Sequence, residues 1–112
     1  MNADRFGLPA LTVERIAGVL ARHPKVEKAL LYGSRAKGNY KNGSDIDLTL
    51  CGEGLGFQEL IAMVGELDDL LLPYTIDLSI FEMLDHAPLR NHIERIGQEF
   101  YRRQDAEQPE RP

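Results

Sequence analysis

Residues 33–48 read Gly-Ser-Arg-Ala-Lys-Gly-Asn-Tyr-Lys-Asn-Gly-Ser-Asp-Ile-Asp-Leu, and most of the fold can be worked out from this stretch. Its first part is rich in Gly, Ser, Asn and Lys, a composition typical of a turn or loop. Residues 45–50 then alternate polar and apolar side chains, as a β-strand does. Because alternate side chains of a strand share one face, Asp45 and Asp47 are expected to project side by side.

Two further strands are expected around this stretch. Residues 26–32 form a short, mostly apolar run closed by a glycine, which favours a buried strand. Residues 74–80 alternate again and place Asp77 on their polar face. If the last two strands are neighbours, Asp45, Asp47 and Asp77 form one acidic cluster. Three carboxylates on one sheet face can hold two metal ions, the arrangement that assists phosphoryl transfer.

Three helices are expected from the apolar periodicity. Thr12 can cap the first, which ends near His23 because the residue before a proline disfavours the α conformation. The second has its apolar residues on one helical face, interrupted only by Asp68. The residues of that face are Phe57, Leu60, Ile61, Val64 and Leu71. The third runs from near Pro88 to Arg103, and Phe100 belongs to its stripe.

This order of elements predicts an α+β (mixed α/β) fold, in which helices flank a small β-sheet. With 112 residues, the chain is expected to form one domain over residues 1–103. Residues 1–10 are interpreted as a loose leader, and the polar tail 104–112 as disordered. No apolar run is long enough to span a membrane, and the N-terminus does not have the pattern of a secretory signal, so a cytoplasmic protein is expected.

Charge and cysteine content exclude some classes of function. The net charge of −5 predicts no stable binding to nucleic acid, so affinity for a nucleotide must come from a local site. The single cysteine, Cys51, cannot form an internal disulfide. The three histidines lack ligand-type spacing with the aspartates and are expected at the surface. Tyr32 is expected in the core, whereas Tyr40 either stacks on a base or is a solvated loop residue.

The Gly-Ser turn is expected to hold phosphate groups. A glycine lets the backbone approach a phosphate closely, and a serine hydroxyl can donate to it. If a short helix begins at Ser34, its free N–H groups point at the same anion, and basic side chains add positive charge. The expected nucleotide-binding residues are Gly33, Ser34, Arg35, Lys37 and Ser44. A Gly-Ser turn alone is usually only a turn, and an Asp-x-Asp pair is usually a solvated face, so the combination carries the interpretation.

The pattern Gly33-Ser34-x10-Asp45-x-Asp47 resembles the signature of the DNA polymerase beta-like nucleotidyltransferase superfamily. Residues 33–48 are similar to those of the minimal nucleotidyltransferases, with the pattern G-S-x-A-R-G-x5-S-D-I-D-L. One departure is Lys37, which stands where an arginine is usual and lacks its bidentate fork. Residues 93–101 are weakly similar to the closing helix of the short members.

The resemblance implies a small mixed sheet with flanking helices and an enzyme that uses ATP and two Mg²⁺ ions. It assigns Asp45, Asp47 and Asp77 as catalytic and metal-binding residues, and Asp77 as the acceptor of the attacking hydroxyl's proton. Short members resemble the antitoxin of a type VII toxin–antitoxin module. Their expected partner is a helical HEPN-type RNase toxin, to whose tyrosine they transfer AMP.

Two other functions stay open at this point. One is a non-catalytic binding module that inhibits its partner by occlusion. The other is a transferase for a small molecule such as an aminoglycoside, against which the short chain argues because it has little room for an acceptor domain. The sequence also leaves open whether the chain forms a homo-oligomer or a hetero-oligomer with the toxin.

Overall fold

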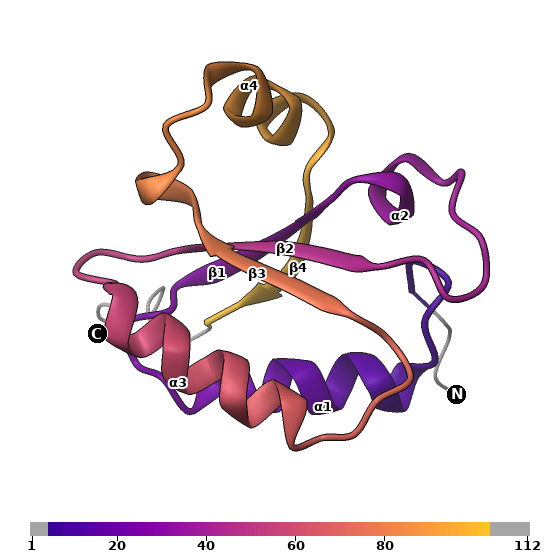
Figure 1. Ribbon diagram of the computed structural model, residues 1–112, viewed down its shortest axis with the longest axis horizontal. Helices are drawn as coiled ribbons and strands as arrows, with labels where there is room; N and C mark the ends of the chain where they lie inside the picture. The colour runs from indigo at the N-terminus through magenta and orange to yellow at the C-terminus, as the bar shows by residue number, and fades with distance from the viewer. Residues whose placement is uncertain (1–4, 104–112) are drawn as a thin grey trace, which may run out of the picture.

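The computed structural model describes residues 5–103, and their strands form one four-stranded mixed sheet (Figure 1). The strands are β1 (Lys28–Tyr32), β2 (Ile46–Cys51), β3 (Ile76–Ile80) and β4 (Gln98–Arg102), in the order β3-β2-β1-β4. Strand β1 pairs antiparallel with β2 and β4, whereas β2 and β3 run parallel. This arrangement confirms the predicted α+β fold. The predictions for residues 1–4 and 104–112 lie outside the described residues.

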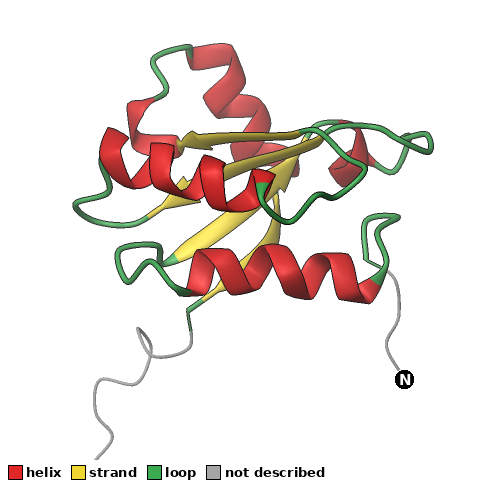
Figure 2. Ribbon diagram, turned by 60° about the horizontal axis from the view of Figure 1, so that its bottom comes forward, coloured by secondary structure: helices red, strands yellow, loops and turns green. Residues whose placement is uncertain are grey.

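Helices lie on both faces of this sheet (Figures 1 and 2). Helices α1 (Ala10–Ala21) and α3 (Phe57–Asp68) cover one face, and α4 (Ala87–Ile96) lies on the other. A short helix, α2 (Ser34–Lys37), follows β1, and a 3₁₀ turn, η1 (Phe81–Met83), follows β3. No helix among residues 5–103 has the length and apolar composition needed to cross a membrane.

The core lies between the sheet and the pair α1 and α3. Strand β2 turns its alternate apolar side chains towards these helices, and all of them are fully buried. Helix α1 contributes its own stripe because apolar residues three and four apart share one side of a helix. The core residues from these two elements include Ile16, Val19, Leu20, Ile46, Leu48 and Leu50.

Residues 5–9 are packed against the rest of the chain, unlike the loose leader that the sequence predicted. Leu8 is fully buried in the core, and its backbone bridges to Arg5. Helix α1 begins after Pro9, so Thr12 does not cap it but lies buried in its first turn. Burial of the Leu8 side chain is favourable, and it fixes the position of the residues on either side of it.

The C-terminal helix is shorter than expected. It ends at Ile96, and residues 98–102 form β4 instead of continuing it. A side chain at position 97 would collide with the carbonyl oxygen of Ile93, so Gly97 fits the point where the chain leaves the helix. Phe100 is still buried, but from a strand. The predicted likeness of residues 93–101 to a closing helix is therefore wrong from residue 98 onwards.

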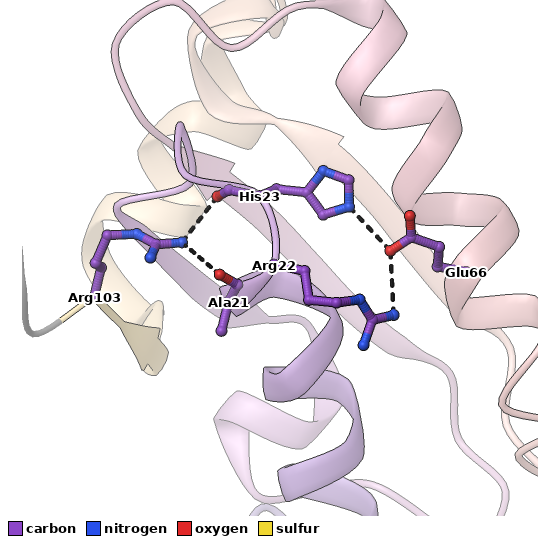
Figure 3. Close-up of polar contacts among 5 residues, drawn as sticks. All are labelled: Ala21, Arg22, His23, Glu66 and Arg103. Carbon is purple, nitrogen blue, oxygen red and sulfur yellow. Dashed lines mark hydrogen bonds and ion pairs between the residues drawn. The ribbon is translucent and has the colours of Figure 1, made fainter.

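Polar contacts fasten the ends of α1, α3 and β4 to one another (Figure 3). His23 Nε2 lies 3.0 Å from Glu66 Oε1, and Arg22 Nη2 donates to the same oxygen at 3.3 Å. The Arg103 guanidinium donates to the carbonyl oxygens of Ala21 and His23 at 3.1 and 2.9 Å. His23, expected at the surface, is therefore a partly buried member of this cluster.

Candidate functional site

A row of polar side chains crosses the sheet on the face opposite α1 and α3. Asp47 of β2 is directly paired with Asp77 of β3 and, on its other side, with Tyr32 of β1. Asp45 lies just before β2 begins and is exposed. The strands that carry Asp47 and Asp77 are therefore neighbours, which was the condition for an acidic cluster.

The carboxylates are close enough to affect one another. Burial raises the pKa of Asp47 above its ordinary value, and the charges of Asp77 and Asp45 raise it further. A raised pKa means that the ionised form of Asp47 is disfavoured where it stands. A divalent cation would reverse this, because it neutralises the like charges that disfavour ionisation.

The donor set suits Mg²⁺, which prefers oxygen ligands and is usually held by one or two carboxylates together with substrate phosphates. Within residues 5–103, however, no three His, Cys, Asp or Glu side chains are arranged to hold one ion as they stand. The residues therefore fit a metal that is bound together with a nucleotide rather than in a closed, all-protein cage.

Gly33 connects β1 to the turn and lies directly against this row. Its φ of +79° belongs to the left-handed region, which favours glycine. A Cβ built at this position would also collide with the Asp47 carboxylate. The backbone of Gly33 was expected to lie close to a phosphate. In the structure it lies close to the Asp47 carboxylate instead, and the lack of a side chain at Gly33 makes this contact possible.

Helix α2 follows Gly33, as the sequence predicted for a helix beginning at Ser34. It has only four residues and ends at Gly38, which has a φ of +88°. Ser34 is partly buried, and Lys37 is exposed. The contacts expected between these two side chains and a triphosphate stay predictions.

Arg35 has a place that the sequence did not suggest. It is 3% exposed, and its guanidinium donates to the carbonyl oxygen of Ser44 through Nε and Nη2, at 3.1 and 2.9 Å. Nη1 donates to the carbonyl oxygen of Phe6 at 2.9 Å, and the rings of Tyr40 and Tyr74 lie against the cation. Through these contacts the Arg35 guanidinium holds the loop before Asp45, and its N–H donors point at the backbone rather than at a ligand.

Two other loop residues also have local partners. The Ser44 hydroxyl accepts the backbone N–H of Lys41 at 2.8 Å, which closes the turn over residues 41–44. Tyr40 stacks on the Arg35 cation, and its ring occupies the place of a side chain at Gly7. Ser44, expected to bind the nucleotide, and Tyr40, expected to stack on a base or to be solvated, are therefore both engaged in holding the loop.

Tyr32 is the site residue that sequence reasoning missed. It is buried, as expected for a core residue, but it belongs to the carboxylate row. Burial raises the pKa of its phenol, a hydrogen bond with Ser79 lowers it, and the charges of Asp77 and Asp47 raise it. The ring of His92 on α4 contacts Tyr32 edge-on, with ring centroids 6.4 Å apart. The sequence did contain a clue: Tyr32 is the last residue of its strand, and antiparallel pairing with the next strand places it opposite Asp47.

A second polar row lies behind the first. Ser79 of β3 donates to the Thr49 hydroxyl of β2 at 3.0 Å, and Thr49 is fully buried. Both residues are two positions beyond a carboxylate on the same strand, so they continue the same face of the sheet away from the carboxylates. The polar face is thus open at its carboxylate end and closed behind it.

A comparison with protein families decides the class to which this site belongs. The family model described as "Polymerase beta, Nucleotidyltransferase" matches residues 14–106 of the chain. The chain belongs to this nucleotidyltransferase family. The match confirms the resemblance found in residues 33–48, and members of the family generally use a nucleotide and a divalent metal. No curated protein matches the chain.

Solved structures agree with this nucleotidyltransferase fold. A toxin–antitoxin structure with AMP-PNP has a TM-score of 0.66 and 20% identity, covering 87% of this chain and 78% of that chain. The toxin–antitoxin MntA-HepT has a TM-score of 0.63 and 18% identity, covering 90% and 79%. A complex of tri-AMPylated Shewanella oneidensis HEPN toxin with MNT antitoxin has a TM-score of 0.62 and 19% identity, covering 88% and 76%.

Proposed function

We propose that this nucleotidyltransferase is the antitoxin of a type VII module and transfers AMP from ATP to a tyrosine of a HEPN-type toxin. The observation that carries the proposal is the row formed by Asp47 and Asp77, with Asp45 beside it, at the end of the Gly33 turn. The similar solved structures include a HEPN toxin that carries AMP and a complex with an ATP analogue, which supports the choice of partner and donor.

The proposed roles divide between the strands and the turn. Asp45, Asp47 and Asp77 would hold two Mg²⁺ ions, which stabilise the charge that develops on the phosphates. Ser34 and Lys37 contact the triphosphate, and Gly33 makes room for the Asp47 carboxylate beside them. Arg35 and Ser44, in contrast, hold the loop that leads to Asp45.

The transfer itself is a displacement at the α-phosphorus. The tyrosine oxygen of the acceptor bonds to this phosphorus, the bond to the β-phosphate's bridging oxygen breaks, and pyrophosphate leaves. Asp77 accepts the proton of the attacking hydroxyl, a role for which an exposed carboxylate beside the other two is well placed.

The test is to incubate the purified chain with its toxin partner, ATP and Mg²⁺, and to record intact masses. An added AMP on the partner, absent with Asp47→Asn, supports the proposal. For Asp77→Asn, we expect transfer to be lost while some ATP·Mg²⁺ binding stays. Equal loss of binding and transfer would contradict its role as the proton acceptor.

The alternative function is a module that inhibits its partner by occlusion, which requires no transfer of AMP. Tight binding and inhibition of the toxin with no mass change, in the wild type and in Asp47→Asn alike, would identify this function instead.

A further inference from the structure

One side of α3 carries apolar side chains that the rest of the described chain leaves uncovered. The exposed fractions are 62% for Phe57, 55% for Ile61 and 37% for Val64. These positions are four and three residues apart, so they lie in line along the helix. The other side of α3 supplies Met63 and Leu67 to the core. The helical face on which the sequence placed Phe57, Ile61 and Val64 is therefore largely turned away from the core.

Leu71 is a further exposed apolar residue, three positions after the end of α3. Its side chain is 87% exposed, and its φ of +56° lies in the left-handed region. Glycine or asparagine is usual in this conformation after a helix, because a larger side chain is strained there. A strained and almost fully exposed leucine suggests a contact outside the chain. We call Phe57, Ile61, Val64 and Leu71 the α3 ridge.

A pocket of about 210 Å³ opens beside the ridge. Its walls include Val64 and Asp68 of α3, and Leu72, Tyr74 and Ile76 from the segment that follows. This volume is below that of pockets for drug-sized ligands but suits one long side chain. The lining is mainly polar and includes a carboxylate beside apolar side chains. Such a lining fits arginine or lysine, whose stem packs on apolar surface while its cation stays near a counter-charge.

The charges around the ridge are acidic. Helix α3 contains no Lys or Arg. Lys25 pairs with Glu59, and Arg22 and His23 pair with Glu66. Within the part of the chain that the structure describes, no cation is paired with Asp68 or Asp69, beside the ridge's C-terminal half.

The possible occupants differ in charge and composition. Residues 1–4 and 104–112 are mostly polar and offer few side chains for an apolar ridge. A second copy would bring the same carboxylates and the same net charge of −5. A basic partner complements the ridge, and a helix matches its straight shape, as in complexes where an amphipathic helix lies in an apolar groove.

We propose that the α3 ridge and its pocket bind an amphipathic helix of a partner protein, with Arg or Lys flanking its apolar residues. Because α3 covers the sheet face opposite the Asp47 row, such a helix leaves the carboxylates accessible (Figure 1). The inference rests on the proposed function only in identifying the partner as the helical toxin.

The probe is a labelled synthetic peptide of about 18 residues, which spans about 27 Å as a helix. It has leucines at helical spacing flanked by lysines, and a matched peptide has glutamate in place of each lysine. We expect the lysine peptide to bind at least about tenfold more tightly, a difference of about 1.4 kcal/mol. Ile61→Glu and Val64→Glu should each weaken this binding at least about tenfold. The matched control is Leu11→Glu, because Leu11 is 60% exposed on α1 and lies outside the ridge.

The proposal would be overturned by equal affinity for the two peptides. It would also be overturned if Ile61→Glu and Val64→Glu both bound the lysine peptide as tightly as the wild type. Sedimentation showing a wild-type dimer that Ile61→Glu makes monomeric would overturn it as well, because the occupant would then be a second copy. Thermal unfolding of each variant confirms that it is folded. If the wild type binds the lysine peptide through the ridge but transfers no AMP to any partner, the proposed function fails while this inference stands.

Discussion

The two faces of strand β2 differ in what covers them. On one face Ile46, Leu48 and Leu50 are fully buried beneath α1 and α3. On the other face Asp47 is only partly buried, while Thr49, two residues further, is fully buried. The same strand thus supports the core with one face and carries the ionisable row on the other. Stability and chemistry should therefore respond separately to substitutions on the two faces.

The largest effect is expected on the apolar face. Leu48→Ala removes a fully buried side chain and leaves a cavity, so the free energy of unfolding should fall by about 2–5 kcal/mol. The measurement is denaturant unfolding followed by circular dichroism. AMP transfer per folded molecule should stay close to that of the wild type. A loss of transfer in fully folded Leu48→Ala would break the separation of the two faces.

On the polar face, Asp47→Asn should lower transfer by about 10²–10³-fold, the range for removal of one charge-stabilising group. Asparagine keeps the volume of the side chain but removes the negative charge, which the charges of Asp77 and Asp45 repel. Stability without metal should therefore be unchanged or higher, as thermal unfolding would show. A clear drop in melting temperature would mean that the carboxylate holds the fold together as well.

Arg35 connects the two faces, because it holds the loop before Asp45 and packs on Tyr74, which itself packs against the core. Arg35→Lys removes the planar guanidinium and its paired N–H donors. The free energy of unfolding should fall by about 1.5–3 kcal/mol, the range for hydrogen bonds to charged groups. The control is Lys37→Arg on the same helix, which should leave stability unchanged and transfer equal or higher. If Arg35→Lys unfolds like the wild type, its carbonyl contacts contribute nothing.

The pH dependence gives a smaller and more selective test of the Asp47 row. The pKa of Asp47 is raised in the folded state, so protonation is favoured by folding. Its contribution is fully present below the ordinary aspartate pKa and is lost as pH rises through the raised one. In metal-free buffer, the stability of Asp47→Asn relative to wild type should therefore increase with pH across this window. Mg²⁺ affinity of the wild type should increase in the same direction. A difference in stability that does not vary with pH would contradict the raised pKa.

Sequence patterns predicted these two faces well because alternation directly determines which side chains of a strand share a face. The pairing of Asp47 with Asp77 needed only that the two strands be neighbours, and they are. Helix α3 was harder because it is apolar on two sides: Met63 and Leu67 pack inwards, while Ile61 and Val64 do not. Periodicity identifies an apolar stripe but not the element that covers it.

The remaining differences come from contacts between segments distant in the sequence. Strand β4 was missed because Phe100 continues the helical stripe of α4 as well as it fits a strand. Arg35 was assigned to a phosphate because its carbonyl partners, on Phe6 and Ser44, are known only once the chain has folded. A local pattern cannot show where such a hydrogen bond ends.

The smallest effect is expected deep in the polar face. Ser79→Ala removes the hydrogen bond to Thr49 and should cost about 0.5–1.5 kcal/mol of stability. It also removes the bond that lowers the pKa of Tyr32, so the phenol should titrate at higher pH. Absorbance titration of the tyrosines measures the second effect. An unchanged titration curve would contradict the effect of Ser79 on the Tyr32 phenol.

The position of β4 has a consequence for how this protein is made. Strand β1 is synthesised well before its second partner, which is formed by residues 98–102. Until those residues leave the ribosome, one edge of β1 has unpaired N–H and C=O groups, which invites pairing with other chains. The sheet therefore closes only after residues 98–102 have left the ribosome, and a chain cut before Gly97 would expose a central strand as an edge.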